Sequence, residues 1–268
     1  MPFQYKKVLV IGATSGIGEA LASKLAENGT KVIVTGRRKE NLDKFVEKHG
    51  KDMAEAIQFD ITQLDKVPGF AKSVMESHPD VDSVFLNSGI QRGFDFSKPD
   101  TVDLDELTTE LNTNYLSYIH LTMAFLPYLQ KQKNETSLIY TTSGLALVPM
   151  LRCANYCATK AALHHWILCL REQLKGGPGN VKVIEIFPPA VQTELHDEKH
   201  QPDIKNGGAI GMPLKDFTEE TYAGLEAGKD QIAVGMSAGS FNSWEQDRQK
   251  AFHHMTEALN KMMSQHSK

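Results

Sequence analysis

Tyr156 and Lys160 are four residues apart, a spacing that lets two side chains act together on one substrate. The stretch from Tyr156 to Leu174 is typical of a helix, and helical positions four apart project from the same face. Lys160 can therefore place a positive charge beside the phenol. A nearby cation favours phenolate and lowers the pKa of tyrosine from about 10 toward neutrality. A tyrosine with such a pKa serves as a general acid or base.

Ser143 stands where the apolar, β-branched run 137–142 ends, and that run predicts a buried strand. From the strand end its hydroxyl can reach the same reacting oxygen as Tyr156. Asn155 is the expected cap of the helix that follows. A Tyr-x-x-x-Lys spacing also arises by chance in many helices, as a surface pair with a half-buried tyrosine. The catalytic interpretation therefore depends on a cofactor site elsewhere in the chain.

A glycine-rich turn predicts that cofactor site. The run 8–11 reads as a strand, Gly12, Gly16 and Gly18 follow it, and 19–28 reads as a helix. The first glycine turns the chain, the second leaves room for a diphosphate, and the third allows close packing of helix on strand. The helix N-terminus attracts the anion. The alternative is a plain tight turn, and a P-loop is disfavoured because the motif lacks Gly-Lys-Ser/Thr. The predicted cofactor-binding residues here are Gly12, Thr14, Ser15, Gly16, Ile17 and Gly18.

Two arginines, Arg37 and Arg38, follow the second predicted strand, 32–35. In dinucleotide-binding folds an acidic residue at this place binds the ribose 2′-hydroxyl, whereas an arginine accommodates a 2′-phosphate. The chain has no acid there, and guanidinium suits phosphate. The sequence therefore favours NADP(H) over NAD(H). The alternative is a pair of solvated arginines that open the helix 39–48.

Two further predicted strands, 57–60 and 84–86, end in residues suited to a bound nucleotide. Asp60 could bond an adenine amino group, or merely cap the next helix. Asn87 could tie neighbouring strand ends together, and Gly89 lets a cofactor lie close. The predicted cofactor-binding residues at these ends are Asp60, Ile61, Asn87 and Gly89.

Strands and helices alternate along the whole chain, which predicts an α/β fold. We expect a Rossmann-type doubly wound sheet of about seven parallel strands with helices on both faces, in a single domain 1–268, with its ligand at the carboxyl ends of the strands. The polar segment 194–213 is the expected substrate lid, and 244–263 the expected C-terminal helix. The other expected elements are a helix over 104–130 that Pro127 bends or ends, a strand over 181–187, a helix over 216–227 and a strand over 231–234.

Composition argues against several classes of protein. The 268 residues carry a net charge of −4, which disfavours a nucleic-acid or anionic-membrane role, and no apolar run reaches the length of a membrane span. Three cysteines without Cys-x-x-Cys spacing favour a reducing compartment, and the first residues leave no room for a signal peptide, so we expect a cytoplasmic protein. The adjacent histidines in His164-His165 and His253-His254 point apart on a helix, and no metal site is predicted.

The chain resembles the classical short-chain dehydrogenases/reductases over about residues 6–235, and within them is most similar to DltE-like oxidoreductases of bacteria and fungi. The family's cofactor motif appears as Gly12-x-x-x-Gly16-x-Gly18, and part of its Asn-Asn-Ala-Gly motif appears as Asn87 and Gly89. Pro189 departs from the pattern, because it stands where the family has a glycine. The family's catalytic residues map by spacing onto Asn114, Ser143, Tyr156 and Lys160.

The resemblance implies a role for each of these residues. Tyr156 would exchange a proton with the substrate oxygen, and Ser143 would stabilise that oxygen. Lys160 would lower the pKa of the tyrosine and bind the nicotinamide ribose. Asn114 would hold a helix distortion and a proton-relaying water. The turn after the sixth strand would meet the nicotinamide through Pro189, Val191 and Thr193.

The expected activity is hydride transfer between NADPH and a ketone or aldehyde, with Tyr156 as general acid or base. Two alternatives stay open: an NAD-dependent alcohol dehydrogenase, and a dinucleotide-binding sensor or scaffold without turnover. The segments expected to line the substrate pocket are 91–96, 145–153 and the lid 194–213. Their apolar members, among them Phe94, Leu147 and Met150, indicate a largely apolar carbonyl compound. A homodimer or homotetramer is implied by the resemblance alone.

Overall fold

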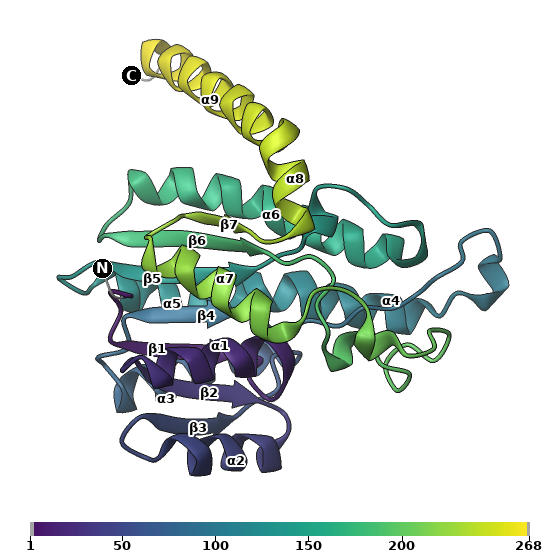
Figure 1. Ribbon diagram of the computed structural model, residues 1–268. Helices are drawn as coiled ribbons and strands as arrows, with labels where there is room; N and C mark the ends of the chain where they lie inside the picture. The colour runs from purple at the N-terminus through teal and green to yellow at the C-terminus, as the bar shows by residue number, and fades with distance from the viewer. Residues whose placement is uncertain (1–2, 267–268) are drawn as a thin grey trace.

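The computed structural model describes residues 3–266 and has one seven-stranded parallel sheet with helices on both faces (Figure 1). The strand order is β3-β2-β1-β4-β5-β6-β7, so the predicted Rossmann-type doubly wound fold is confirmed. The strands are β1 (Lys7–Ile11), β2 (Lys31–Gly36), β3 (Ala54–Gln58), β4 (Ser83–Leu86), β5 (Thr136–Thr141), β6 (Val181–Phe187) and β7 (Gln231–Ala233).

The main helices cover the two faces of the sheet. One face carries α1 (Gly16–Glu27), α2 (Lys39–His49) and α7 (Leu214–Glu226), and the other carries α3 (Val67–Ser77), α5 (Ser117–Gln130) and α6 (Ala154–Lys175). The shorter α4 (Leu104–Leu111) precedes α5, and the chain finishes in α8 (Met236–Ser240) and α9 (Gln246–His266). Figure 1 shows α9 projecting away from the rest of the molecule.

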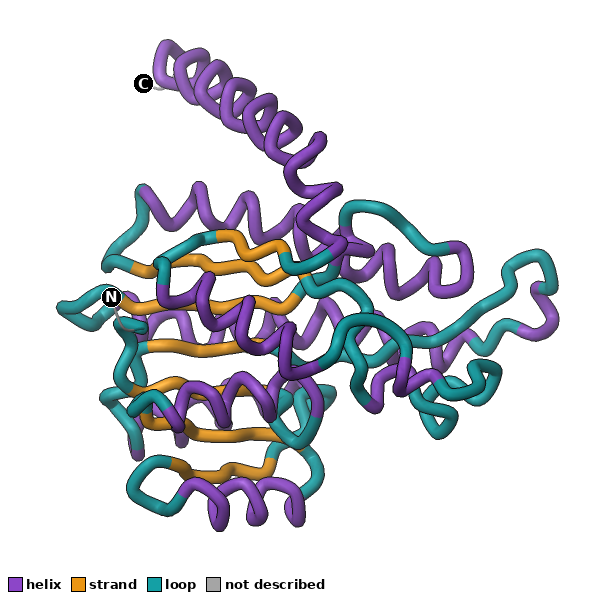
Figure 2. Tube along the Cα trace, in the orientation of Figure 1, coloured by secondary structure: helices purple, strands orange, loops and turns teal. Residues whose placement is uncertain are grey.

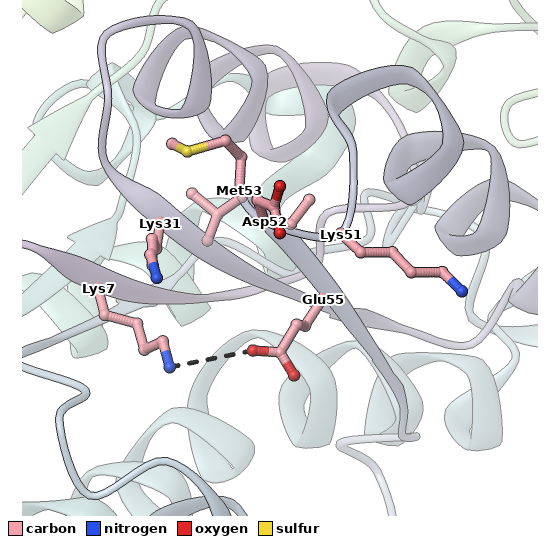
Figure 3. A pocket seen from close by; sticks show the side chains of 8 residues that line it. Lys7, Lys31, Lys51, Asp52, Met53 and Glu55 are labelled. Carbon is pink, nitrogen blue, oxygen red and sulfur yellow. Dashed lines mark ion pairs between the residues drawn. The ribbon is translucent and has the colours of Figure 1, made fainter.

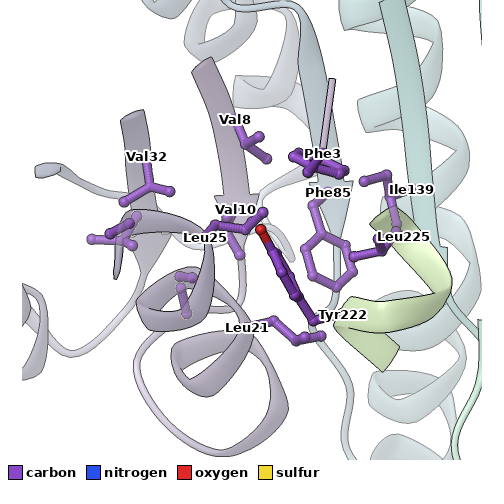
Figure 4. Packing of buried hydrophobic residues seen from close by; sticks show 14 of the residues in the cluster. Phe3, Val8, Val10, Leu21, Leu25, Val32, Phe85, Ile139, Tyr222 and Leu225 are labelled. Carbon is purple, nitrogen blue, oxygen red and sulfur yellow. The ribbon is translucent and has the colours of Figure 1, made fainter. Parts of the chain in front are cut away.

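Side chains of β1 alternate between the two cores. Val8 and Val10 pack with Leu21, Leu25 and Tyr222 of the helices on one face (Figure 4), and their neighbours in the strand enter the other core. A strand buried on both faces needs an uninterrupted apolar run rather than alternation. That is why the short run at the start of the chain predicts its strand well.

Two predicted segments, the third strand and the C-terminal helix, have different bounds in the structure. The third strand covers Ala54–Gln58 rather than 57–60, because β3 is an edge strand whose exposed residues broke the apolar pattern. The helix through Pro127 ends at Gln130 as predicted, and the proline does not end it; the proline is exposed, so water can bond the carbonyl that it leaves free. The C-terminal helical segment begins at Met236 and ends at His266, beyond both ends of 244–263.

Two helical segments contain a π-helical turn, in which the hydrogen bonds skip one extra residue. The predicted helix 104–130 is interrupted at Asn112–Leu116, and the tail is interrupted at Phe241–Glu245. Such turns are rare and occur often at functional sites. Each of them carries a fully buried polar side chain, Asn114 in the first and Glu245 in the second.

The carboxyl ends of the strands carry the long irregular connections (Figure 2). The predicted lid 194–213 is largely irregular, with two short 3-10 turns, Glu194–His196 and Gly207–Ala209. A bridge between Val191 and Met212 closes its base. Across the part of the chain from 3 to 266, none of the helices combines the length and apolarity needed to cross a membrane.

Candidate active site

Lys160 and Asn114 come together at the carboxyl end of β5. The Lys160 Nζ donates to the carbonyl oxygen of Thr141, the last residue of that strand, at 2.9 Å. A Cβ atom added to Gly89 would lie 3.5 Å from the Asn114 Oδ1 and 3.8 Å from the Lys160 Nζ. Both polar groups therefore lie within van der Waals reach of a side chain at position 89.

The Asn114 side chain makes three hydrogen bonds, with Ile90 and Thr159. Its Oδ1 accepts from the Ile90 backbone N–H at 2.9 Å, and its Nδ2 donates to the Ile90 carbonyl at 2.8 Å and to the Thr159 Oγ1 at 3.3 Å. These bonds join the π-helical turn to the chain after β4 and to α6. The side chain is fully buried, so its position is determined by the fold.

Tyr156 is buried, and its surroundings disfavour the phenolate form. Burial raises its pKa far above 10, and a hydrogen bond with the Ser143 hydroxyl offsets this only in part. Burial also lowers the pKa of Lys160 to about 7. The Lys160 Nζ lies 5.8 Å from the centre of the Tyr156 ring. The expectation that Lys160 lowers the pKa of this tyrosine is therefore not met in the structure, because burial disfavours the charged form of both groups.

Ser143 lies at the strand end as expected, buried beside Tyr156, and its Oγ accepts from the Leu145 N–H at 3.0 Å. Asn155 does not cap α6, which begins at Ala154. Its side chain instead donates to the buried Glu110 at 2.6 Å. The helix thus starts two residues earlier than predicted, and the asparagine links it to α4.

The glycine-rich turn packs tightly against two neighbouring strands. Gly12 has φ +86°, and a Cβ atom there would lie 2.5 Å from the Ser88 Oγ. A Cβ atom on Gly18 would lie 2.1 Å from the Gly12 carbonyl oxygen. Asn87 also donates to that carbonyl, at 3.2 Å, and accepts from the Thr141 hydroxyl at 2.9 Å. The predicted tie between strand ends is thus present.

Replacing Gly18 with alanine is expected to lower the free energy of unfolding by about 1–3 kcal/mol, because the added methyl group would overpack a backbone contact. Urea unfolding measures this effect. Gly69→Ala is the matched control: its Cβ meets no described atom within 4 Å, and alanine suits the interior of α3. Equal stability of the Gly18→Ala protein and the wild type would contradict the packing described here.

Arg38 reaches the glycine-rich turn. Its Nη2 donates to the Thr14 Oγ1 at 2.8 Å and to the Ser15 Oγ at 2.6 Å. Its Nη1 forms an ion pair at 2.7 Å with Glu194, which also accepts a short hydrogen bond from Ser15. A lid carboxylate therefore lies at the N-terminus of α1, beside an arginine. This is the place where a phosphate would bind.

The remaining predicted cofactor residues lie around this turn. Asp60 accepts from the backbone N–H of Thr62 at 3.0 Å and from its hydroxyl at 2.8 Å, so it stabilises a local turn. The Ile61 side chain packs in the core, and Ile17 packs against the other core. Arg37 is exposed next to Arg38. After β6 the structure places Pro189, Val191 and Thr193 in order, and a Cβ on Gly16 would lie 3.3 Å from Thr193.

A buried charged network, which no sequence pattern predicted, lies behind the site. Both ring nitrogens of His164 hydrogen-bond to carboxylates. Nδ1 lies 2.8 Å from Glu185 of β6, and Nε2 lies 2.9 Å from Glu245 of the tail. Glu185 accepts from Thr142, next to Ser143, at 2.9 Å. The available signal was Glu185 itself, a carboxylate inside an otherwise apolar strand.

A depression at the opposite edge of the sheet is lined by residues from the amino ends of β1, β2 and β3, among them Lys7, Lys31 and Glu55 (Figure 3). Lys7 and Glu55 form an ion pair at 3.9 Å. The predicted catalytic and cofactor residues lie at the carboxyl ends of the strands instead. Among residues 3–266, no group of three His, Cys, Asp or Glu side chains is placed to hold a metal ion.

Comparisons with known proteins agree with this arrangement. The family model for short chain dehydrogenases matches residues 6–203. The oxidoreductase DltE of Bacillus subtilis, whose function is uncharacterized, is 32% identical over 248 residues, which cover 92% of this chain and 95% of DltE. The predicted resemblance, including the DltE-like oxidoreductases, is thus confirmed.

Two further proteins bear on the cofactor. The NADP-dependent 3-hydroxy acid dehydrogenase YdfG of Salmonella typhi is 32% identical over 221 residues, which cover 80% of this chain and 87% of YdfG. The structure of a short chain dehydrogenase/reductase from Burkholderia phymatum in complex with NAD superposes with a TM-score of 0.77. It is 18% identical and covers 97% of this chain and 96% of its own, so it shows the shared fold alone.

Proposed function

Because this chain belongs to the short-chain dehydrogenase/reductase family, we propose that it is an NADP(H)-dependent oxidoreductase that transfers hydride between NADPH and a ketone or aldehyde. The observation that carries the proposal is the buried group formed by Asn114, Ser143, Tyr156 and Lys160 at the carboxyl end of β5. Burying four polar side chains costs stability, and a protein that only bound a nucleotide would have no need of this arrangement.

Each residue has a role that its geometry supports. When bound, NADPH would supply the hydride. Tyr156, which burial keeps protonated, would donate a proton to the substrate oxygen during reduction. Ser143, its hydrogen-bond partner, would orient that oxygen. Lys160 and Asn114 both lie beside Gly89. Lys160 would bind the cofactor ribose, and Asn114 would bind a water.

The preference for NADP(H) rests on Arg38. Its guanidinium lies with Thr14 and Ser15 at the N-terminus of α1, and it already binds the carboxylate of Glu194. A ribose 2′-phosphate would replace that carboxylate, and Arg37 would contribute from the exposed side. The naming of YdfG as NADP-dependent supports this preference.

Titration with NADPH and NADH tests the cofactor proposal. Arg38→Ala is expected to weaken NADPH binding by about 10- to 100-fold, because a charged hydrogen-bonding partner of the phosphate is lost, and to leave NADH binding nearly unchanged. Glu194→Gln is expected to tighten NADPH binding, because it removes the competing negative charge. Arg37→Ala measures how much the neighbouring arginine contributes to NADPH affinity. NADH binding that equals or exceeds NADPH binding would rule out the NADP(H) preference.

The two other functions are distinguishable from this one. An NAD-dependent alcohol dehydrogenase would be favoured by tight NADH binding, and a sensor or scaffold by cofactor binding without turnover of any carbonyl compound. YdfG is named for 3-hydroxy acids, so small hydroxy and oxo compounds are the first substrates to test. The cytoplasmic location and the homodimer or homotetramer are part of this proposal and are tested by fractionation and by light scattering.

A further inference from the structure

Arg152 lies four residues before Tyr156, in the 3-10 turn Leu151–Cys153 that leads into α6. Its carbonyl accepts from the Phe94 N–H at 3.1 Å, which ties it to the chain after β4. A Cβ atom on Gly93 would lie 3.1 Å from the Arg152 Nη2, so the guanidinium rests against that glycine. Arg152 is therefore held at the side of the site where the loops after β4 and β5 meet.

The lid supplies the other contacts of this guanidinium. Nε donates to Asp203 at 2.9 Å and Nη2 donates to its second oxygen at 2.6 Å, while Nη1 makes a short hydrogen bond to Gln201. Gln201 is 1% exposed, and its Nε2 donates to Gln91 at 3.0 Å and to the Leu195 carbonyl at 2.8 Å. One arginine thus joins three loops at the carboxyl ends of the strands.

The Arg152–Asp203 pair has the geometry by which proteins recognise a carboxylate, two parallel bonds from one guanidinium. The two partners differ in exposure: 28% of the arginine side chain is accessible, against 61% of the aspartate. An ion pair with so exposed an aspartate contributes little to stability. The aspartate can therefore be exchanged for another carboxylate at small cost.

Two neighbouring basic residues, Arg92 and His196, are less suited than Arg152 to bind a carboxylate. Arg92 pairs with Glu106 of α4 at 2.6 Å and donates to the Gln91 carbonyl. Burial and the charge of Arg152 lower the pKa of His196, which disfavours the charged form of this histidine. Arg152 is thus a charged group that already binds a carboxylate beside the turn that leads to Tyr156.

We propose that Arg152 binds a carboxylate group of the substrate, which makes the substrate an oxo acid or hydroxy acid, and that Asp203 is the counter-ion displaced on binding. This inference rests on the proposed oxidoreductase function and narrows its substrate class. It adds a carboxylate to the expected, largely apolar carbonyl compound. The exposed Val148 and Met150 remain available to cover the rest of the molecule.

The test compares an acid with its neutral ester. The kcat/KM for NADPH-dependent reduction is measured with 3-oxobutanoate and 4-oxopentanoate and with the methyl ester of each. Arg152→Gln is expected to lower kcat/KM for the acids by about 10- to 100-fold and for the esters by less than about 3-fold, because only the acids lose a charged hydrogen bond. Asp203→Asn is expected to raise kcat/KM for the acids, because it removes the competitor.

Arg92→Gln is the matched control, since it removes a neighbouring arginine that pairs with α4. It is expected to leave kcat/KM unchanged for both the acids and the esters. NADPH titration checks that each variant is folded. The inference would be overturned if Arg152→Gln lowered kcat/KM equally for acid and ester, or if Asp203→Asn lowered it as Arg152→Gln does. Either result would mean that the Arg152–Asp203 pair only holds the lid in place. Wild-type turnover of the esters in preference to the acids would also overturn it and leave the oxidoreductase proposal standing. NADPH binding without reduction of any acid, ester or aldehyde would overturn both.

Discussion

Replacing Tyr156 with phenylalanine is expected to lower kcat by about 10²- to 10⁴-fold, the usual contribution of a positioned general acid. The variant lacks the proton that the buried phenol holds and keeps the ring that packs with Cys153, Cys157 and Leu145. The folded structure and NADPH affinity should therefore remain close to those of the wild type. Steady-state reduction of a carbonyl substrate, together with cofactor titration, measures the two effects separately.

Tyr128→Phe is the control for the loss of a tyrosine hydroxyl. Tyr128 lies near the end of α5 and packs against the core at a distance from the predicted catalytic residues. Its replacement is expected to leave kcat unchanged. Turnover by the Tyr156→Phe protein at the wild-type rate would mean that another group supplies the proton.

Replacing His164 with glutamine is expected to lower the free energy of unfolding by about 3–5 kcal/mol, because it removes the cation that two buried carboxylates share and leaves Glu185 with only Arg171, at 4.0 Å. Glu185 and Glu245 are both fully buried, and Arg248 contacts Glu245 from the tail at 2.7 Å. His165→Gln serves as the control, since His165 lies next to His164 but is not flanked by the two carboxylates. Urea unfolding compares the two variants with the wild type.

The same network predicts how stability depends on pH. Burial lowers the pKa of His164, but the two carboxylates outweigh this and raise it to about 9. A group with a raised folded-state pKa stabilises fully below its unfolded pKa of about 6.5 and loses that contribution as pH rises through 9. The wild type is therefore expected to lose about 3 kcal/mol between pH 6.5 and 9 from this histidine. A His164→Gln protein should lack that loss, and a retained loss would assign it to other groups.

At low pH the partner carboxylate titrates instead. Burial raises the pKa of Glu245, but hydrogen bonds from His164, Arg248 and Gln249 bring it down to about 2. A carboxyl group with a lowered folded-state pKa stabilises above its unfolded pKa and loses that contribution as pH falls through 2. The network is thus expected to stabilise most between about pH 4.5 and 6.5.

Much of the site could be predicted because its residues are close together in the sequence. Tyr156 and Lys160 share one helix, and the glycines of the first turn act on their own backbone. Periodicity and spacing determine such features. The centre of the sheet was equally predictable, since β1 and β4 are buried on both faces and read as largely apolar runs.

The contacts that the sequence did not reveal join residues far apart in the chain. Glu194 meets Arg38 and Asp203 meets Arg152 only because the lid folds back over the strand ends. A charged residue in a polar loop looks the same whether it is solvated or paired. The pKa of Tyr156 was misjudged for a related reason: spacing indicates a neighbour, but burial, which depends on the whole fold, decided the direction of the shift.

The two π-helical turns have a consequence for how the chain can vary in length. Each accommodates one residue more than an ordinary turn, at Asn112–Leu116 and at Phe241–Glu245, and each directs a buried polar side chain inward. Removing one residue from either turn would restore an ordinary α-helical turn, so the helix beyond would keep its orientation while residues of the turn itself would move around the helix axis by up to about 100°. Asn114 would then face away from α6, or Glu245 away from His164. We therefore expect natural relatives to keep a constant residue count through these two helices while the lid between 194 and 213 gains or loses residues freely.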